Sequence, residues 1–103
     1  MTKIKPIPIP HPGQTLLEDF MQPLGLSQYR LAKDIGVAPM RISQITRGQR
    51  SITADTALRL ARYTGTSAQF WLNLQTAYEL RLAEQSIAGR IEKEVKILER
   101  VAA

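Results

Sequence analysis

Apolar side chains recur at intervals of three or four along most of this chain, which is the spacing of amphipathic helices. No segment alternates apolar and polar residues in the manner of a half-buried strand, so the predicted fold class is all-α. Five helices are expected, beginning near Thr15, Gln28, Pro39, Ala54 and Ala68. A last amphipathic stretch, residues 87–101, would place on one side Ile87, Ile91, Val95 and Leu98.

Capping residues set the expected helix boundaries. Ser27, Thr53 and Ser67 stand where a side-chain oxygen can accept a hydrogen bond from the first turn of a helix. Gly36 and Gly65 are placed to end the second and fourth helices in the left-handed conformation. The apolar residues expected on the fourth and fifth helices are Ala54, Ala57, Leu58 and Ala61, then Phe70, Trp71, Leu74, Ala77 and Tyr78.

The chain is expected to divide into three parts. Prolines alternate with other residues between positions 3 and 13, which blocks a helix and favours an extended polyproline II arm. We therefore predict an extended arm over residues 1–13, a helical domain over residues 14–82, and a C-terminal helical tail over residues 83–103. Gly89 weakens the helix near the start of the last amphipathic stretch.

The run SQYRLAKDIGVAPMRISQI, from Ser27 to Ile45, contains two short amphipathic segments separated by Gly36. Two helices joined by a tight turn that contains glycine describe a helix-turn-helix. Ala32 is small where the two helices must cross closely, and Ile42 and Ile45 anchor the second helix to the core. Residues 14–82 are therefore predicted to form a helix-turn-helix domain.

The outward face of the second helix of this motif follows from its geometry. With Ile42 and Ile45 facing inward and about 100° per residue, the opposite face carries Met40, Gln44 and Arg47. Ser43 lies beside these residues and Arg41 on the flank. Gln can bond adenine edges, Arg can bind guanine or phosphate, and Met can touch a thymine methyl group. The alternative is an ordinary solvated helix face, which basic side chains usually indicate.

The basic charge is concentrated on the same stretch. The chain carries 14 Lys and Arg against 9 Asp and Glu, for a net charge of +5. Asp34 is the only acidic residue between Ser27 and Arg50, so five basic residues minus one acidic residue place +4 there: Arg30, Lys33, Arg41, Arg47 and Arg50. Gln28 begins the preceding helix, where its amide can approach a DNA phosphate. Turn spacing, charge and Gln28 together favour DNA binding over a solvated face.

Several function classes lack the residues they need. The chain has no cysteine and one histidine, His11, which excludes disulfides, thiolate metal sites and a Ser/His/Asp relay. It also has no Gly-rich phosphate loop and no paired carboxylates at helical spacing in an apolar setting. We therefore expect no enzyme activity, no cofactor and no metal. The absence of an apolar leader and of a membrane-length run predicts a cytoplasmic protein with no membrane partner.

The run LSQYRLAKDIGVAPMRISQITRGQRSITADTALRLARYTGTSAQFWLNLQTAYEL resembles the Xre/Cro-like helix-turn-helix domain. Together with HPGQTLLEDFMQPLGLS, it is similar more narrowly to the HigA-type antitoxins of bacterial HigB/HigA toxin–antitoxin pairs. The resemblance covers about His11 to Leu80, and RGQRSITADTALRLA and FWLNLQ are its most specific parts. It implies a five-helix bundle of the Xre/Cro/lambda-repressor type, here with the additional C-terminal helical tail.

The resemblance also implies a function. Such antitoxins are homodimeric repressors that bind a palindromic operator in double-stranded DNA, and many neutralise a HigB-like ribonuclease toxin. Carried over by position, the DNA-contacting residues would be Gln28, Pro39, Met40, Arg41, Ser43, Gln44, Arg47, Arg50 and Ser51. This chain departs from the pattern at Ala38, where such domains commonly have Ser or Thr as a cap, and that puts a phosphate contact at this helix start in doubt. A stand-alone Xre-family regulator and a helical protein-interaction adaptor are the alternatives.

The fifth helix predicts a dimer. Trp71, Leu72 and Tyr78 cannot all point the same way, so the helix is either wholly buried in its own domain or packed partly against a second subunit. A symmetric operator needs two copies of the reading helix, which favours the dimer. The tail would assist this interface, but its residues also allow it to fold back on its own domain or to hold a toxin.

Overall fold

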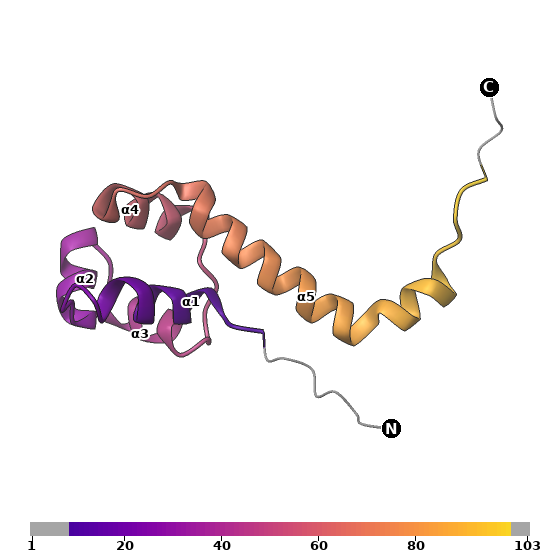
Figure 1. Ribbon diagram of the computed structural model, residues 1–103, viewed down its shortest axis with the longest axis horizontal. Helices are drawn as coiled ribbons and strands as arrows, with labels where there is room; N and C mark the ends of the chain where they lie inside the picture. The colour runs from indigo at the N-terminus through magenta and orange to yellow at the C-terminus, as the bar shows by residue number, and fades with distance from the viewer. Residues whose placement is uncertain (1–8, 100–103) are drawn as a thin grey trace.

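The computed structural model describes residues 9–99, which fold as a helical bundle with one projecting helix (Figure 1). No strand occurs among these residues, which confirms the predicted all-α class. The predicted arm falls largely outside the described residues, as does the end of the tail. The elements are α1 (Pro12–Thr15), the π-helical segment η1 (Leu16–Met21), α2 (Gln28–Ile35), α3 (Pro39–Thr46), α4 (Ala54–Thr64) and α5 (Ala68–Glu94).

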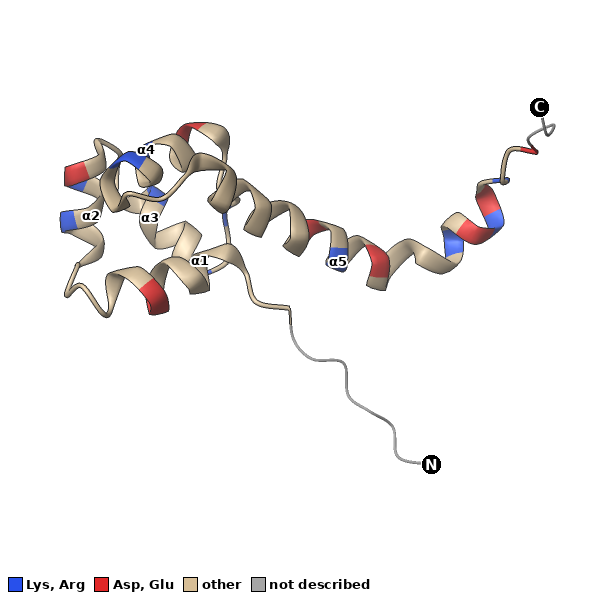
Figure 2. Cartoon of the chain, turned by 45° about the horizontal axis from the view of Figure 1, so that its top comes forward, with Lys and Arg blue, Asp and Glu red and all other residues tan. Residues whose placement is uncertain are grey.

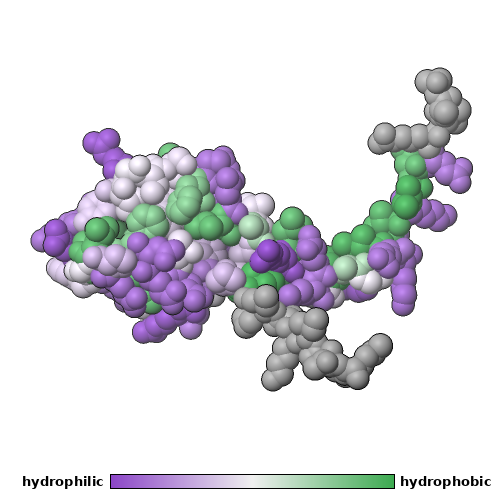
Figure 3. Space-filling model, in the orientation of Figure 1, coloured by the Kyte–Doolittle hydropathy of each residue, from purple (hydrophilic) through white to green (hydrophobic). Residues whose placement is uncertain are grey.

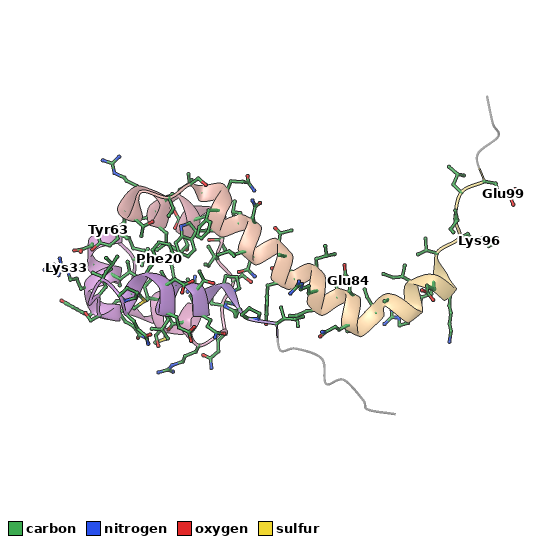
Figure 4. The ribbon with its side chains drawn as sticks, viewed as in Figure 1. Phe20, Lys33, Tyr63, Glu84, Lys96 and Glu99 are labelled. Carbon is green, nitrogen blue, oxygen red and sulfur yellow. The ribbon has the colours of Figure 1, made fainter. Side chains whose placement is uncertain are left out.

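The core of the bundle is aliphatic around one tryptophan. Trp71 is fully buried in it, and its ring centroid is 5.0 Å from that of Phe70 and 5.0 Å from that of Phe20, which is labelled in Figure 4. α4 packs on α5 and α2 packs on α3, so each pair closes one side of this core. The buried apolar side chains are Leu16, Met21, Leu31, Ala32, Ile35, Ile42, Ile45, Ile52, Ala57, Leu60 and Trp71.

The first helix begins at Pro12, three residues before the predicted start at Thr15. Proline suits the first helical position because its missing N–H has no partner there. His11 supplies the cap, since its Nδ1 accepts a hydrogen bond from the backbone N–H of Gly13 over 2.9 Å. Pro12 and Gly13 are buried, so the last two residues of the predicted arm belong to the bundle.

The predicted caps of the other helices hold in part. The Oγ atoms of Ser27 and Ser67 accept hydrogen bonds from the first turns of α2 and α5, both at 3.0 Å. Gly36 and Gly65 end α2 and α4 with φ of 75°, in the left-handed region that glycine tolerates. Thr53 occupies the predicted position before α4, but its side chain makes no capping hydrogen bond.

The buried face of α4 differs from the predicted stripe. The structure buries Thr56, Ala57 and Leu60, whereas Ala54 is exposed and Leu58 is 63 % exposed. Ala57 belongs to both stripes, so the real face is turned by about one residue, or about 100°. Alanines carry little apolar area and leave the rotation of a helix poorly specified, whereas packing of α4 against α2 and α5 fixes it.

The last helix is continuous where the sequence suggested a weak point. α5 runs for 27 residues through Gly89 to Glu94, so the helical part of the predicted tail is the second half of α5. One glycine costs a helix only about 1 kcal/mol relative to alanine, which is too little to interrupt a helix of this length. Val95 and Leu98 lie beyond the helix end, in contrast to the predicted helical stripe.

Candidate nucleic-acid interface

The turn between α2 and α3 has a defined hydrogen-bond pattern. The backbone N–H of Val37 donates to the carbonyl of Ala32 over 2.9 Å, and that of Gly36 donates to Lys33 over 3.3 Å. This is the Schellman arrangement that closes a helix with glycine in the left-handed conformation. Ala32 is fully buried, as are Ile42 and Ile45 on α3, so the turn presents α3 in one orientation.

The face of α3 opposite Ile42 and Ile45 is exposed, as the helical period predicted. Met40 is 65 % exposed and Arg47 is exposed, while Gln44 is half-buried. Pro39 begins the helix after Ala38, whose side chain makes no cap. The side chains that line this surface are Pro39, Met40, Ser43, Gln44 and Arg47, and we call it the α3 face.

Gln28 connects the two helices of the motif. Its Nε2 donates a hydrogen bond to Thr46 Oγ1 at the end of α3 over 3.1 Å, and Thr46 Oγ1 donates to the carbonyl of Ser43 over 3.1 Å. The amide of Gln28 carries two N–H groups, so the second can still reach a ligand. The position chosen from sequence for a phosphate contact therefore also fixes the crossing of α2 and α3, a role that Thr46 shares and that sequence reasoning missed.

Gln44 and Arg50 contact each other on the α3 face. Arg50 Nη1 donates to Gln44 Oε1 over 3.3 Å, across the turn that follows α3. The contact turns the amide nitrogen of Gln44 away from Arg50 and brings a cation beside the centre of the face. These two predicted residues are thus brought together, although six positions separate them in the chain.

Arg41 is held on the flank of α3 by a residue of α4. Its Nη1 donates to Asp55 Oδ2 over 2.6 Å and lies 3.5 Å from Thr56 Oγ1. Arg59 Nε donates to the same carboxylate over 3.1 and 3.2 Å. The hydrogen bond from Arg41 is the main cause that holds the pKa of Asp55 below its ordinary value, and that from Arg59 adds to it. Sequence reasoning missed Asp55, because an acid in the first turn of a helix is ordinary.

The segment after α3 is anchored from α5. The backbone N–H of Ile52 donates to Gln75 Oε1 over 2.8 Å, and both side chains are buried. Arg50 and Ser51, predicted near the DNA backbone, are exposed immediately before this anchor. Nothing in the sequence separates the buried Gln75 from an ordinary solvated glutamine, so only the fold assigns it this role.

Two of the five basic side chains between Ser27 and Arg50 are engaged in ion pairs, which reduces the free positive charge near α3. Arg30 pairs with Asp34 at 3.5 Å, and Arg41 pairs with Asp55. Within residues 9–99, no ion pair involves the other three cations of the stretch, Lys33, Arg47 and Arg50. Figure 2 shows the charged residues of the bundle, and Lys33 lies at the end of the bundle away from the tip of α5 (Figure 4).

Trp71 does not belong to a dimer surface, which corrects the prediction. Its side chain is fully buried, and its Nε1 donates to Thr66 Oγ1 over 2.8 Å. Leu72 is half-buried against the core, and the half-buried Tyr78 meets the His11 ring edge-on at 4.9 Å. The apolar excess of the first half of α5 is therefore largely used within the chain, because the helix crosses both α1 and α4.

The second half of α5 carries an apolar groove instead. Figure 3 shows hydrophobic residues along this projecting part of the helix. The lining residues are Leu80, Ala83, Glu84, Ile87, Ala88 and Ile91. Among residues 9–99, no helix has the length and apolarity to cross a membrane, and no cluster of three acidic, His or Cys side chains could hold a metal ion.

Comparison with known proteins finds a helix-turn-helix family match and similar antitoxin structures. Residues 17–71 match the family described as helix-turn-helix. Virulence-associated protein I of Dichelobacter nodosus is 58% identical over 79 residues, which cover 77% of this chain and 73% of that protein. The structure of the Pseudomonas aeruginosa antitoxin HigA with the higBA promoter aligns with a TM-score of 0.86 at 40% identity, over 89% of this chain and 100% of that one. The antitoxin GraA in complex with its operator aligns with a TM-score of 0.84 at 40% identity, over 97% and 98%.

Proposed function

This chain belongs to the Xre/Cro-like helix-turn-helix family, and from that premise we propose that it represses transcription as a homodimer on a palindromic operator. The observation that carries the proposal is the α3 face, where Met40 and Arg47 are exposed and Gln44 is half-buried between them, on a helix fixed by its turn and by Gln28. Base-reading chemistry on a rigid helix is what direct readout in the major groove requires. Lys33 and Arg50 would neutralise phosphates at the edges of the contact.

The dimer is supported by the groove on the second half of α5. Leu80 is 57 % exposed and Ile91 is 46 % exposed, so the single chain leaves considerable apolar area in water. Charges of both signs follow each other along the same part of the helix, and Arg90 pairs with Glu94 at 3.4 Å. Such mixed charge suits a second copy of the same helix better than a strongly charged partner.

The antitoxin role rests on the names of the structural neighbours, HigA and GraA, each at 40% identity. We propose that this chain likewise neutralises a small ribonuclease toxin of the HigB type. The second candidate, a stand-alone regulator, is supported by the same α3 face and differs only in lacking a toxin.

The test begins with enrichment of a random-sequence duplex library on the purified protein. A repressor of this kind selects a palindrome whose half-sites lie about one helical turn apart, roughly 10 base pairs. If the protein enriches no particular sequence from the random library, the proposal is contradicted. The antitoxin role is tested by expressing small neighbouring reading frames: one of them should arrest growth, and co-expression of this chain should restore it. If the chain is a stand-alone regulator, its co-expression restores growth against none of these reading frames.

A further inference from the structure

The carboxylate of Asp55 forms ion pairs with two arginines that belong to different helices. Arg41 of α3 reaches it at 2.6 Å and Arg59 of α4 at 3.1 Å. Arg59 also uses its Nη1 to donate to the carbonyl of Ile35 over 2.9 Å and to that of Gly36 over 3.3 Å. The end of α2, the turn and the flank of α3 are thus joined through a single acidic side chain.

This arrangement leaves part of the Arg41 guanidinium available. Nη1 is engaged by Asp55 and Thr56, while no partner for Nε or Nη2 occurs within residues 9–99. The flat guanidinium has five N–H donors in a fixed plane, so anchoring one nitrogen sets the direction of the others. Arg41 is in the first turn of α3, about 100° around the helix axis from the exposed Met40, so its side chain flanks the α3 face.

The exposure of the Arg41–Asp55 pair limits what this pair contributes to folding. The Asp55 side chain is 54 % exposed and that of Arg41 is 27 % exposed. Ion pairs at such exposure contribute little to stability, because water screens them. A negative charge placed beside a DNA-binding surface also lowers its general attraction for phosphates within a Debye length of about 10 Å. A residue that weakens general binding while fixing one arginine is suited to raising selectivity.

We propose that Asp55 is a specificity-determining positioning residue for DNA recognition: it holds Arg41 in one orientation at the edge of the α3 face and withdraws its charge from indiscriminate phosphate binding. This inference rests on the proposed function, since it assigns Asp55 a role in the same DNA contact. Asp55 itself touches no DNA. A freed Arg41 would reach phosphates of any sequence, whereas the held Arg41 binds only where the duplex offers an acceptor at one place.

The experiment compares Asp55→Asn with Asp19→Asn, an exposed residue of η1 with the same change of net charge. Binding affinity is measured at several salt concentrations for two DNAs. One is a random 30-base-pair duplex, and the other is the duplex that the wild-type protein selects from the random library, called the enriched duplex. Asp55→Asn should bind the random duplex roughly fivefold more tightly than Asp19→Asn does, the gain expected of one additional close charge pair in water. The salt slope should steepen by about 0.9 for each phosphate that Arg41 gains. Affinity for the enriched duplex should stay unchanged or fall, so selectivity drops at least roughly fivefold.

The same substitution made in an Arg41→Gln background identifies the route of the effect. If Asp55 acts through Arg41, Asp55→Asn should then behave like Asp19→Asn on both duplexes. An effect of full size in that background would overturn the proposal, as would equal behaviour of Asp55→Asn and Asp19→Asn in the wild-type background. Circular dichroism and melting temperature verify that each variant is folded.

Asp55→Glu serves if the asparagine variant fails to fold. It keeps the charge but moves the carboxylate by one methylene, so the salt slope should stay constant while preference for the enriched duplex falls. Unchanged preference would contradict the proposal. A wild-type protein that binds neither duplex would instead refute the proposed function, and this inference with it, which makes the two failures distinguishable.

Discussion

The backbone of Gly13 lies directly against the carbonyl oxygen of Ile45: a Cβ built on Gly13 would stand 1.8 Å from that oxygen. α1 therefore crosses the last turn of α3 at a distance that only a glycine permits. Because Ile45 anchors α3 to the core, the position of the α3 face depends on this contact.

Gly13→Ala should destabilise the protein, although alanine normally favours a helix. The added methyl group forces α1 away from a backbone atom that cannot yield, so we expect a loss of about 1–3 kcal/mol in the free energy of unfolding. The control is Gly89→Ala, since Gly89 is helical with nothing within 4 Å of its Cβ position. That substitution should stabilise by about 0.5–1 kcal/mol. Urea unfolding measures both, and destabilisation by both variants would refute the packing argument.

Gln44→Ala should weaken binding to the enriched duplex by about 1–3 kcal/mol and leave binding to random DNA nearly unchanged. Gln44 is at the centre of the α3 face, with Arg50 beside its carbonyl oxygen. Fluorescence anisotropy with both duplexes gives the two affinities. The control is Gln69→Ala, because Gln69 is exposed on α5 and its side chain bonds to Asn73. Equal losses on both duplexes would remove Gln44 from the base-reading residues.

The salt dependence should be that of a moderate number of phosphate contacts. Lys33, Arg47 and Arg50 remain outside the ion pairs of the described chain, so a dimer would neutralise roughly 6 phosphates. Affinity should then fall about 10³-fold between 50 and 200 mM salt. A nearly flat dependence would mean that this surface does not face DNA, and a much steeper one that Arg30 and Arg41 leave their carboxylates on binding.

Protein stability should fall on acidification because of His11. Its Nδ1 accepts the capping hydrogen bond of α1, which a protonated ring cannot do, and burial lowers its pKa from the ordinary 6.5. The unfolded chain therefore binds the proton more readily, and stability falls as the pH drops below about 6.5 through the folded pKa. Asp34 and Asp55 have pKa values held below 3.8, so they titrate beneath this range.

His11→Asn provides the matched comparison. Asparagine is a strong helix cap and does not titrate, so the variant should keep its stability between pH 7 and pH 5 while the wild-type protein loses some. Melting temperatures across this interval measure the difference. Parallel curves for the two proteins would show that His11 is not the titrating group.

Ile87→Glu should convert the proposed dimer into a folded monomer, because it places a charge in the apolar groove of α5. Gln85→Glu adds the same charge at an exposed neighbouring position and should leave the dimer intact. Sedimentation at micromolar concentration separates the two states. Truncation after Leu82, which removes most of the groove, should likewise give a monomer; a dimer that survives both changes would place the interface elsewhere.

The sequence by itself determined the helices, the turn and the outward face of α3. Ser27, Gly36 and the inward pair Ile42 and Ile45 act over a few residues, and helical periodicity then fixes which side chains face out. The resemblance to helix-turn-helix proteins and HigA antitoxins rests on the same contiguous runs, and the comparisons confirm it.

Only the tertiary structure decided which side chains are already engaged. Asp55 holds Arg41 from 14 positions away, Gln75 anchors Ile52 from 23 positions away, and Trp71 is enclosed by the core instead of facing a partner. These outcomes depend on how α4 and α5 are rotated against the rest of the bundle. Local pattern leaves that rotation open in helices rich in alanine, because several stripes bury similar apolar area and only packing selects one of them.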